Sequence, residues 1–245
     1  MSQPVRLQAY GVNLFPGAWT KSALKKALKK NWITVNGQVA STATLIRGGE
    51  RIQLTRPATT ELKKKLYLDI TVLYEDDYLV IIHKPAGVVV SGNTFRTVAN
   101  ALPQYLRPST LTDAAQPQPV HRLDYGTTGV LLIGKTSSAI RKLNQLFEQK
   151  EIQKTYYAVT IGKMEEKGTL DGPIDGKAAR SEYERCATVA SARFTQLNLV
   201  KLYPQTGRRH QLRKHLARSG HPILGDKDYS QAGLVLRGKG IYLHA

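Results

Sequence analysis

The sequence predicts an α+β protein in which a mixed, largely antiparallel sheet with flanking helices follows a small basic α/β module. Three observations carry this prediction. The length of 245 residues fits a small module plus a larger domain. β-rich apolar runs separated by turn residues occur in WITVNGQVA and in LDITVLYEDDYLVIIHKPAGVVVSG. Residues 1 to 65 hold twelve Lys and Arg but only Glu50 and Glu61 as acids, which sets this segment apart.

Composition is that of a folded protein. The hydrophobic share is 41%, which is ordinary for a globular chain and supplies a sizeable core. The single cysteine, Cys186, excludes an internal disulfide and favours a reducing, cytoplasmic compartment. The first residues lack a signal-peptide pattern, and no run of eighteen apolar residues occurs, so we expect neither export nor a membrane span.

The net charge indicates a polyanionic partner. Thirty-six Lys and Arg face eighteen acids, which leaves a formal charge of +18. Such an excess attracts nucleic acid over long distances. The alternative is that the charge only confers solubility.

The amino-terminal segment combines a basic helix with a hairpin. Ser22 is placed to cap a helix whose Leu24, Ala27 and Leu28 share one face. Asn36-Gly37 in WITVNGQVA predicts a two-residue turn between short strands, and RGGERIQL predicts a further turn and strand. The exposed face of the helix carries four basic residues: Lys25, Lys26, Lys29 and Lys30.

This order of elements, over about residues 5 to 56, resembles the S-four RNA-binding module named after a ribosomal protein. The resemblance implies that residues 1–56 bind RNA through the four lysines. The match is partial, because GVNLFPGAWT is a poor first helix of the usual pair. The alternative is an incidental basic helix and hairpin.

Residues 57–66, PATTELKKKL, are predicted to be a linker, and residues 67–245 a second domain. In LDITVLYEDDYLVIIHKPAGVVVSG, two apolar runs flank the acidic turn Glu75 to Asp77, which predicts strand, turn and strand. Residues 97–106 are predicted to form a short helix. DAAQPQPV, rich in Pro and Gln, is predicted to be a loop.

A polar loop directly before the apolar strand VLLIG is the most informative stretch. Its HRLDYGTTG sequence should bend so that Asp124 projects from the loop, because rigid strands commonly support catalytic groups on such loops. Ser137 or Ser138 is then predicted to cap a helix. The buried side of that helix should carry Ile140, Leu143, Leu146 and Phe147.

HRLD-x-x-T-[TS]-G before an apolar strand resembles the signature of the RluA branch of the pseudouridine synthases. Three further blocks strengthen the resemblance: EDDYLVIIHKPAGVVV, the K-x-Y-x-A of Lys154 to Ala158, and TGRRHQLRKHLARSGHPILGDKDY. Together they span about residues 70 to 245. The resemblance implies a pseudouridine synthase fold and an enzyme that isomerises uridine in structured RNA, either ribosomal or transfer RNA.

By this resemblance, Asp124 is the catalytic carboxylate, either as a nucleophile or as the base that removes a ribose proton. Arg213 matches the family arginine that pairs with it and would keep it ionised and oriented. Tyr156 matches the tyrosine that packs on the target base, whereas Tyr157 should point elsewhere. Arg122 would fill the space left by a flipped-out base. The reaction implies no cofactor and no metal.

Each of these residues also has an ordinary structural interpretation. Asp124 alone would be a turn aspartate, Tyr156 a core aromatic, and Arg213 a solvated or phosphate-binding arginine. Arg208 and His210 are predicted to support the loop. The spacing of the histidines at 210, 215 and 221 fits no common zinc motif.

Two other classes of protein remain as alternatives. A non-catalytic RNA-binding or ribosome-assembly protein could use the same basic surface, and the intact catalytic set argues against it. A base-processing hydrolase or deaminase should carry an H-x-E and P-C-x-x-C zinc motif, which this sequence lacks.

The chain departs from the family pattern at three points. Thr128 replaces a commoner serine, Arg209 stands where a small polar residue is frequent, and IYLHA ends where relatives usually continue with another strand. The sequence does not indicate which uridine is modified or the oligomeric state.

Overall fold

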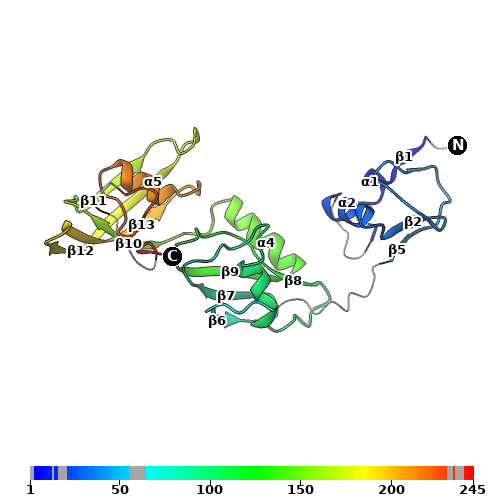
Figure 1. The fold of residues 1–245 in the computed structure, drawn as a ribbon, viewed down its shortest axis with the longest axis horizontal. Helices are drawn as coiled ribbons and strands as arrows, with labels where there is room; N and C mark the ends of the chain where they lie inside the picture. The colour runs from blue at the N-terminus through cyan, green and yellow to red at the C-terminus, as the bar shows by residue number, and fades with distance from the viewer. Residues whose placement is uncertain (1–2, 13, 16–20, 56–64, 231–233, 235–239) are drawn as a thin grey trace. The chain divides into compact units, whose positions relative to one another are not determined.

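The computed structural model of the chain describes residues 3–12, 14–15, 21–55, 65–230, 234 and 240–245. The chain divides after Lys64 into two compact units, each described by itself below (Figure 1). Of the predicted linker at 57–66, residues 57–64 lie outside the described residues, and Leu66 packs against the core of the second unit. No helix in the described part of the chain is long and apolar enough to cross a membrane.

The first unit is a small α/β structure with seven described elements. A three-stranded sheet has the order β3-β2-β5, and β1 pairs with β4. Their bounds are β1 Val5–Arg6, α1 Leu7–Tyr10, α2 Lys21–Lys29, β2 Ile33–Val35, β3 Gln38–Val39, β4 Leu45–Ile46 and β5 Ile52–Leu54.

Helix α2 confirms the predicted amphipathic pattern. Leu24, Ala27 and Leu28 are buried in the core of this unit, while the four lysines predicted for the outer face are exposed. The predicted cap is wrong, because the helix begins at Lys21 and Ser22 lies inside its first turn. The apolar stripe fixes which face of a helix is buried, but it does not fix how many residues precede that stripe.

The predicted hairpin is confirmed between β2 and β3. Asn36 and Gly37 both have positive φ, at 51° and 83°, as a type I′ turn requires. The Asn36 side-chain oxygen also accepts a hydrogen bond from the Arg51 amide at 2.9 Å. In GVNLFPGAWT, the described residues 11, 12, 14 and 15 are not helical, and the rest lies outside the described residues.

The second unit contains two antiparallel sheets. One has four strands in the order β6-β7-β9-β8, and the other has five in the order β11-β12-β13-β10-β14. Helix α4 contacts β8 and β9, and α5 contacts β11. The bounds are β6 Thr71–Glu75, β7 Leu79–Lys84, α3 Val98–Ala101, η1 Leu102–Gln104, β8 Ala114–Pro119, β9 Gly129–Thr136, α4 Ser137–Glu148, β10 Tyr156–Ile161, β11 Lys167–Asp171, β12 Arg180–Ser191, β13 Thr195–Pro204, α5 Gln211–Arg218 and β14 Leu243–His244.

In the four-stranded sheet, the predicted strand, turn and strand are confirmed as β6 and β7. The turn is fixed by Asp76, whose Oδ1 accepts hydrogen bonds from the amides of Tyr78 and Leu79, both at 2.8 Å. The short helix predicted for residues 97–106 is present as α3 and η1.

Two local predictions in this sheet are wrong. DAAQPQPV was expected to be a loop, but Ala114–Pro119 forms strand β8. Proline removes a ladder donor, which an edge strand tolerates, and β8 lies at the edge with an irregular register. The cap of α4 is Thr136, whose hydroxyl accepts from the Ala139 amide at 3.1 Å, and neither Ser137 nor Ser138 takes that role. Thr136 is buried, and it is both the last residue of β9 and the N-cap of α4.

The carboxy-terminal residues join the two sheets. Strand β14, drawn in red in Figure 1, pairs with β10. On its other side, the Thr128 amide donates to the Leu243 carbonyl at 3.1 Å, and the Ala245 amide donates to Thr128 at 2.9 Å. The Val130 amide donates to the Ala245 carbonyl at 3.0 Å. The start of β9 is thereby held against the five-stranded sheet.

Gly129 is predicted to be essential to this junction. Its φ is +121°, and an added Cβ would collide with the Ala245 carbonyl oxygen and amide nitrogen. We expect Gly129→Ala to lower the free energy of unfolding by more than about 3 kcal/mol, measured by urea denaturation. Gly172→Ala is the control, because φ is +133° there with no atom within 4 Å. Equal losses of unfolding free energy in the two variants would contradict the predicted role of Gly129 in this junction.

Candidate active site

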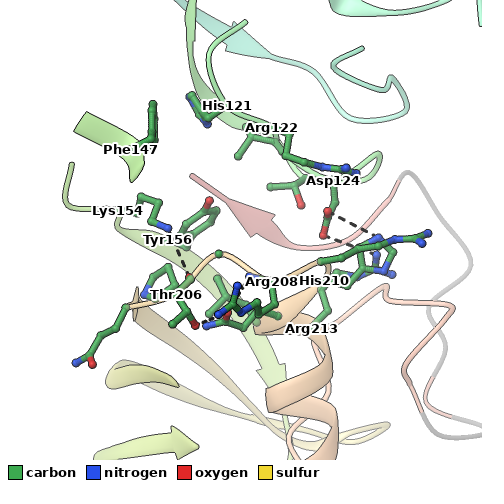
Figure 2. Close-up of a pocket in the computed structure, with 18 of the residues that line it drawn as sticks. His121, Arg122, Asp124, Phe147, Lys154, Tyr156, Thr206, Arg208, His210 and Arg213 are labelled. Carbon is green, nitrogen blue, oxygen red and sulfur yellow. Dashed lines mark hydrogen bonds and ion pairs between the residues drawn. The ribbon is translucent and has the colours of Figure 1, made fainter. Parts of the chain in front are cut away.

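Asp124 lies in the loop between β8 and β9, and a buried lysine holds that loop from beneath. Lys84, fully buried at the end of β7, donates from Nζ to the carbonyls of Thr127 and Pro85, both at 2.8 Å. A longer contact of 3.5 Å reaches the Tyr125 carbonyl. Burial lowers the pKa of Lys84 to about 8, although the Asp124 carboxylate opposes the shift. The loop is therefore fixed by backbone contacts, and the Asp124 side chain is left to face a cavity (Figure 2).

Arg213 on α5 is buried and is held by two acids that sequence reasoning had not included in the site. Its Nε and Nη2 each donate to Asp226 at 2.7 Å, and Nη2 also donates to Asp228 at 2.7 Å. Burial lowers the pKa of Arg213, but these hydrogen bonds outweigh it, so the net shift is upward. The guanidinium is therefore permanently charged and geometrically fixed. The signal for Asp226 and Asp228 was present in GDKDY, at the end of a motif already recognised.

The Asp124 carboxylate has two cationic or polar neighbours at longer range. Arg213 Nη1 lies 4.0 Å from its Oδ2, and His210 Nε2 lies 3.7 Å from its Oδ1. These separations exceed ordinary hydrogen bonds, so neither group saturates the carboxylate. The predicted pairing of Asp124 with Arg213 is thus present as a long contact, while the short contacts of Arg213 go to Asp226.

His210 occupies a strained position at the start of α5. Its φ is +54°, in the left-handed region that few non-glycine residues adopt. Its Nδ1 lies 2.8 Å from the Tyr229 hydroxyl. Burial lowers the pKa of His210 in spite of the nearby Asp124, which favours a neutral imidazole. Its place beside Asp124 agrees with the supporting role expected from the sequence.

Tyr156 is the first residue of β10 and packs against the hydrophobic cores of both sheets. Burial, and then the Asp124 carboxylate, raise the pKa of its phenol to about 12, so the side chain remains neutral. Tyr157 points away as predicted: it is exposed, with the Lys201 ammonium over its ring. Successive side chains of a strand point to opposite faces. Tyr156 therefore lines the cavity, whereas Tyr157 does not.

The cavity has a volume of about 500 Å³, within the range of small-molecule and nucleotide sites. Asp124, Tyr156 and Arg213 all line it, as does Arg122. Arg122 is exposed and forms no ion pair with any residue that the structure describes. One cavity therefore brings together all four residues that the sequence predicts for this domain. The four lysines of α2 belong to the first unit.

The TGRRHQ segment that closes one side of the cavity is braced by Gln211. Its Oε1 accepts from the Thr206 hydroxyl at 2.6 Å and from the Arg208 amide at 3.0 Å. Its Nε2 donates to Arg180 and Ser181 on β12. Arg208 donates from Nε to the Ala178 carbonyl at 3.1 Å. Over the described ranges, no group of three or more His, Cys, Asp or Glu could hold a metal ion.

The fold and the cavity define a class of protein, and comparison with known proteins gives the same class. The family described as RNA pseudouridylate synthase matches residues 78–218, more than half of the chain. The chain belongs to this family. It is an enzyme that isomerises uridine in RNA to pseudouridine.

Curated relatives are similar over nearly the whole chain. Ribosomal large subunit pseudouridine synthase D of Nitrosomonas europaea is 32% identical over 246 residues, covering 93% of this chain and 69% of the relative. Ribosomal large subunit pseudouridine synthase C of Rickettsia conorii is 34% identical over 274 residues, covering 98% and 87%.

Solved structures support the fold. Human RNA Pseudouridylate Synthase Domain Containing 4 has a TM-score of 0.57 at 27% identity, covering 71% of this chain and 81% of its own. Human RNA Pseudouridylate Synthase Domain Containing 1 has a TM-score of 0.61 at 22% identity, covering 72% and 76%.

Asp226 is predicted to be essential for holding Arg213. Its carboxylate is 0% exposed, whereas that of Asp228 is 64% exposed. We expect Asp226→Asn to cost about 3–5 kcal/mol of unfolding free energy, because it removes the charge facing a buried guanidinium. Asp228→Asn, the matched control, should cost less than about 1 kcal/mol. Chemical denaturation of both variants measures the difference, and equal costs would show that Arg213 does not depend on Asp226.

Proposed function

We propose that this enzyme converts a uridine of large-subunit ribosomal RNA to pseudouridine and that Asp124 is its catalytic carboxylate. One observation carries the proposal: Asp124, Tyr156 and Arg213 line a single cavity. The substrate class follows from relatives whose names specify the ribosomal large subunit. The net charge of +18 also favours an RNA partner. Because the proposed substrate is ribosomal RNA, we assign the enzyme to the cytoplasm.

The reaction breaks the bond between N1 of uracil and C1′ of ribose and forms a bond between C5 and C1′. A proton leaves C5 and a proton is gained at N1, so the product is an isomer of the substrate. Asp124 supplies a carboxylate beside the sugar. It acts either as a nucleophile at C1′ or as the base that removes a ribose proton, and both routes require the ionised form. Its long contacts with Arg213 and His210 leave its oxygens accessible.

Arg213 and Tyr156 have complementary roles in this proposal. Arg213, fixed by Asp226, places a positive charge 4.0 Å from the Asp124 carboxylate. Tyr156 offers a neutral aromatic face to the uracil, worth roughly 1–3 kcal/mol of stacking. A stacked ring can turn in its own plane without breaking hydrogen bonds to the wall. That freedom suits a reaction in which the detached base must rotate.

The target base has to leave its stack before Asp124 can reach the sugar, at a cost of a few kcal/mol. Arg122 comes from the same loop as Asp124 (Figure 2), and it is exposed with no ion pair among the described residues. We assign it to the space that the base vacates. There its guanidinium can stack on neighbouring bases or contact phosphate.

The first unit is assigned to RNA binding as an S-four-like module spanning residues 1–56. Its α2 buries an apolar face and exposes Lys25, Lys26, Lys29 and Lys30. Phosphate contacts by such lysines dominate affinity without selecting a sequence. The module thus supplies affinity, and the second unit supplies chemistry.

Asp124→Asn is predicted to abolish pseudouridine formation, by more than about 10³-fold, while RNA affinity changes less than about twofold, because lysine and arginine contacts dominate binding. Pseudouridine mapping of total RNA, from cells carrying the wild type, the variant or no copy of the gene, measures activity and names the uridine. Asp171→Asn is the control, because Asp171 is exposed at the end of β11 and does not line the cavity. Wild-type activity in Asp124→Asn would remove Asp124 from the mechanism.

Replacing Lys25, Lys26, Lys29 and Lys30 by Gln is predicted to weaken RNA binding and to flatten its salt dependence by about 1 for each lysine that contacts phosphate. Deletion of residues 1–56 should act in the same direction. The rate at saturating RNA should stay near the wild-type value, since chemistry belongs to the second unit. Fluorescence anisotropy across a salt series measures the slope, and an unchanged slope would contradict the assignment.

A further inference from the structure

The cavity extends past Tyr156 into a region to which the reaction assigns no role. We call this region the second compartment. In Figure 2, Phe147, His121 and Lys154 lie on the side of Tyr156 away from His210 and Arg213. We define this compartment by six residues that all line the cavity: His121, Phe147, Lys150, Lys154, Thr206 and Arg208.

Lys154 carries a positive charge that no described residue neutralises. Its Nζ lies 3.5 Å from the Thr206 carbonyl, and it forms no ion pair with any carboxylate among the described residues. Glu148 lines the same cavity but is not within ion-pair distance of it. Burial, and then the charge of Lys150, lower the pKa of Lys154. A half-buried ammonium beside another cation is unfavourable until an anion joins it.

The wall around Lys154 is neutral and aromatic. The rings of His121 and Phe147 pack with their centroids 4.7 Å apart. His121 Nε2 accepts a hydrogen bond from the Leu132 amide at 3.0 Å. Burial, and then the charge of Lys154, lower the pKa of His121 to about 4, so its imidazole is neutral near pH 7. The wall therefore supplies no counter-ion for Lys154.

The loop opposite Lys154 leaves room at its ammonium. A Cβ added at Gly207 would lie 3.5 Å from Lys154 Nζ, so a larger residue there would crowd the space in which an anion has to sit. Arg208, next along this loop, uses Nε for the Ala178 carbonyl and also lines the compartment. Lys150, Lys154 and Arg208 thus add positive charge to the lining of a cavity that also holds Asp124.

We propose that Lys154 binds the phosphate of a nucleotide that flanks the target uridine, with Lys150 and Arg208 adding to the positive field. This inference rests on the proposed function, which places the target uridine beside Asp124. Lys154 stands two residues before Tyr156, and both side chains line one cavity, so a single RNA strand can contact both. The contact fixes the register of the strand and carries no base specificity of its own.

Lysine footprinting tests the contact in the full chain. The protein is treated with acetic anhydride, with and without saturating decauridylate, and acetylation is read at each lysine by mass spectrometry. Bound RNA should lower acetylation of Lys154 several-fold and leave Lys163 unchanged, because Lys163 is exposed and outside the cavity. Equal acetylation of Lys154 with and without RNA overturns the proposal. RNA should protect Lys154 equally in the Asp124→Asn variant. This readout does not depend on turnover, so it separates a failure of the phosphate contact from a failure of the catalytic assignment of Asp124.

A matched pair of variants measures the strength of the contact. Lys154→Met keeps most of the length of the side chain and removes the charge, and Lys163→Met makes the same change in charge elsewhere. We expect Lys154→Met to weaken decauridylate binding about fivefold at 0.1 M salt and to reduce the salt slope by about 0.7, as loss of one single-strand phosphate contact requires. Lys163→Met should change neither quantity. Equal effects of the two variants would overturn the proposal.

Discussion

The active site depends on the buried ion pair between Arg213 and Asp226. Asp226 takes two donors of the guanidinium, at Nε and Nη2, so the group cannot rotate. Its Nη1 is left directed at Asp124. Asp226 Oδ1 also accepts from the amides of Asp228 and Tyr229, which ties the acid to the chain that follows α5. The buried carboxylate of Asp226 therefore fixes the position of the positive charge that lies beside Asp124.

The cavity exists because two sheets meet at a short carboxy-terminal strand. Asp124 comes from a loop of the four-stranded sheet, whereas Tyr156 and Arg213 come from β10 and α5 of the other half. Backbone hydrogen bonds between residues 128–130 and 243–245 hold these halves in register. Lys84 fixes the loop from one side and Gln211 fixes the opposite wall. Buried polar networks of this kind restrict side chains to one arrangement more strictly than packing alone does.

Local patterns predicted much of the fold and the residues that line the cavity, but not how they are held. The buried face of α2, the Asn36-Gly37 turn and the loop that carries Asp124 are short-range signals, and the structure agrees with the first two. The support of the loop by Lys84 depends on contacts between distant parts of the chain, which local spacing does not encode. The pairing of Arg213 with Asp226 was missed although GDKDY closes a recognised motif. Strand β8 was missed because proline argues against a strand in general, while the exception depends on its being at an edge.

The position of Tyr156 links the lining of the cavity to the packing of both sheets. Its ring packs against the cores of both sheets, so the two halves cannot rock against each other without tilting the aromatic surface. In the proposed reaction, an RNA base held between that surface and Asp124 bridges the halves from within, alongside the backbone contacts of β14. We therefore expect occupancy of the cavity to slow amide hydrogen exchange at residues 128–130 and 243–245, where the two sheets are joined.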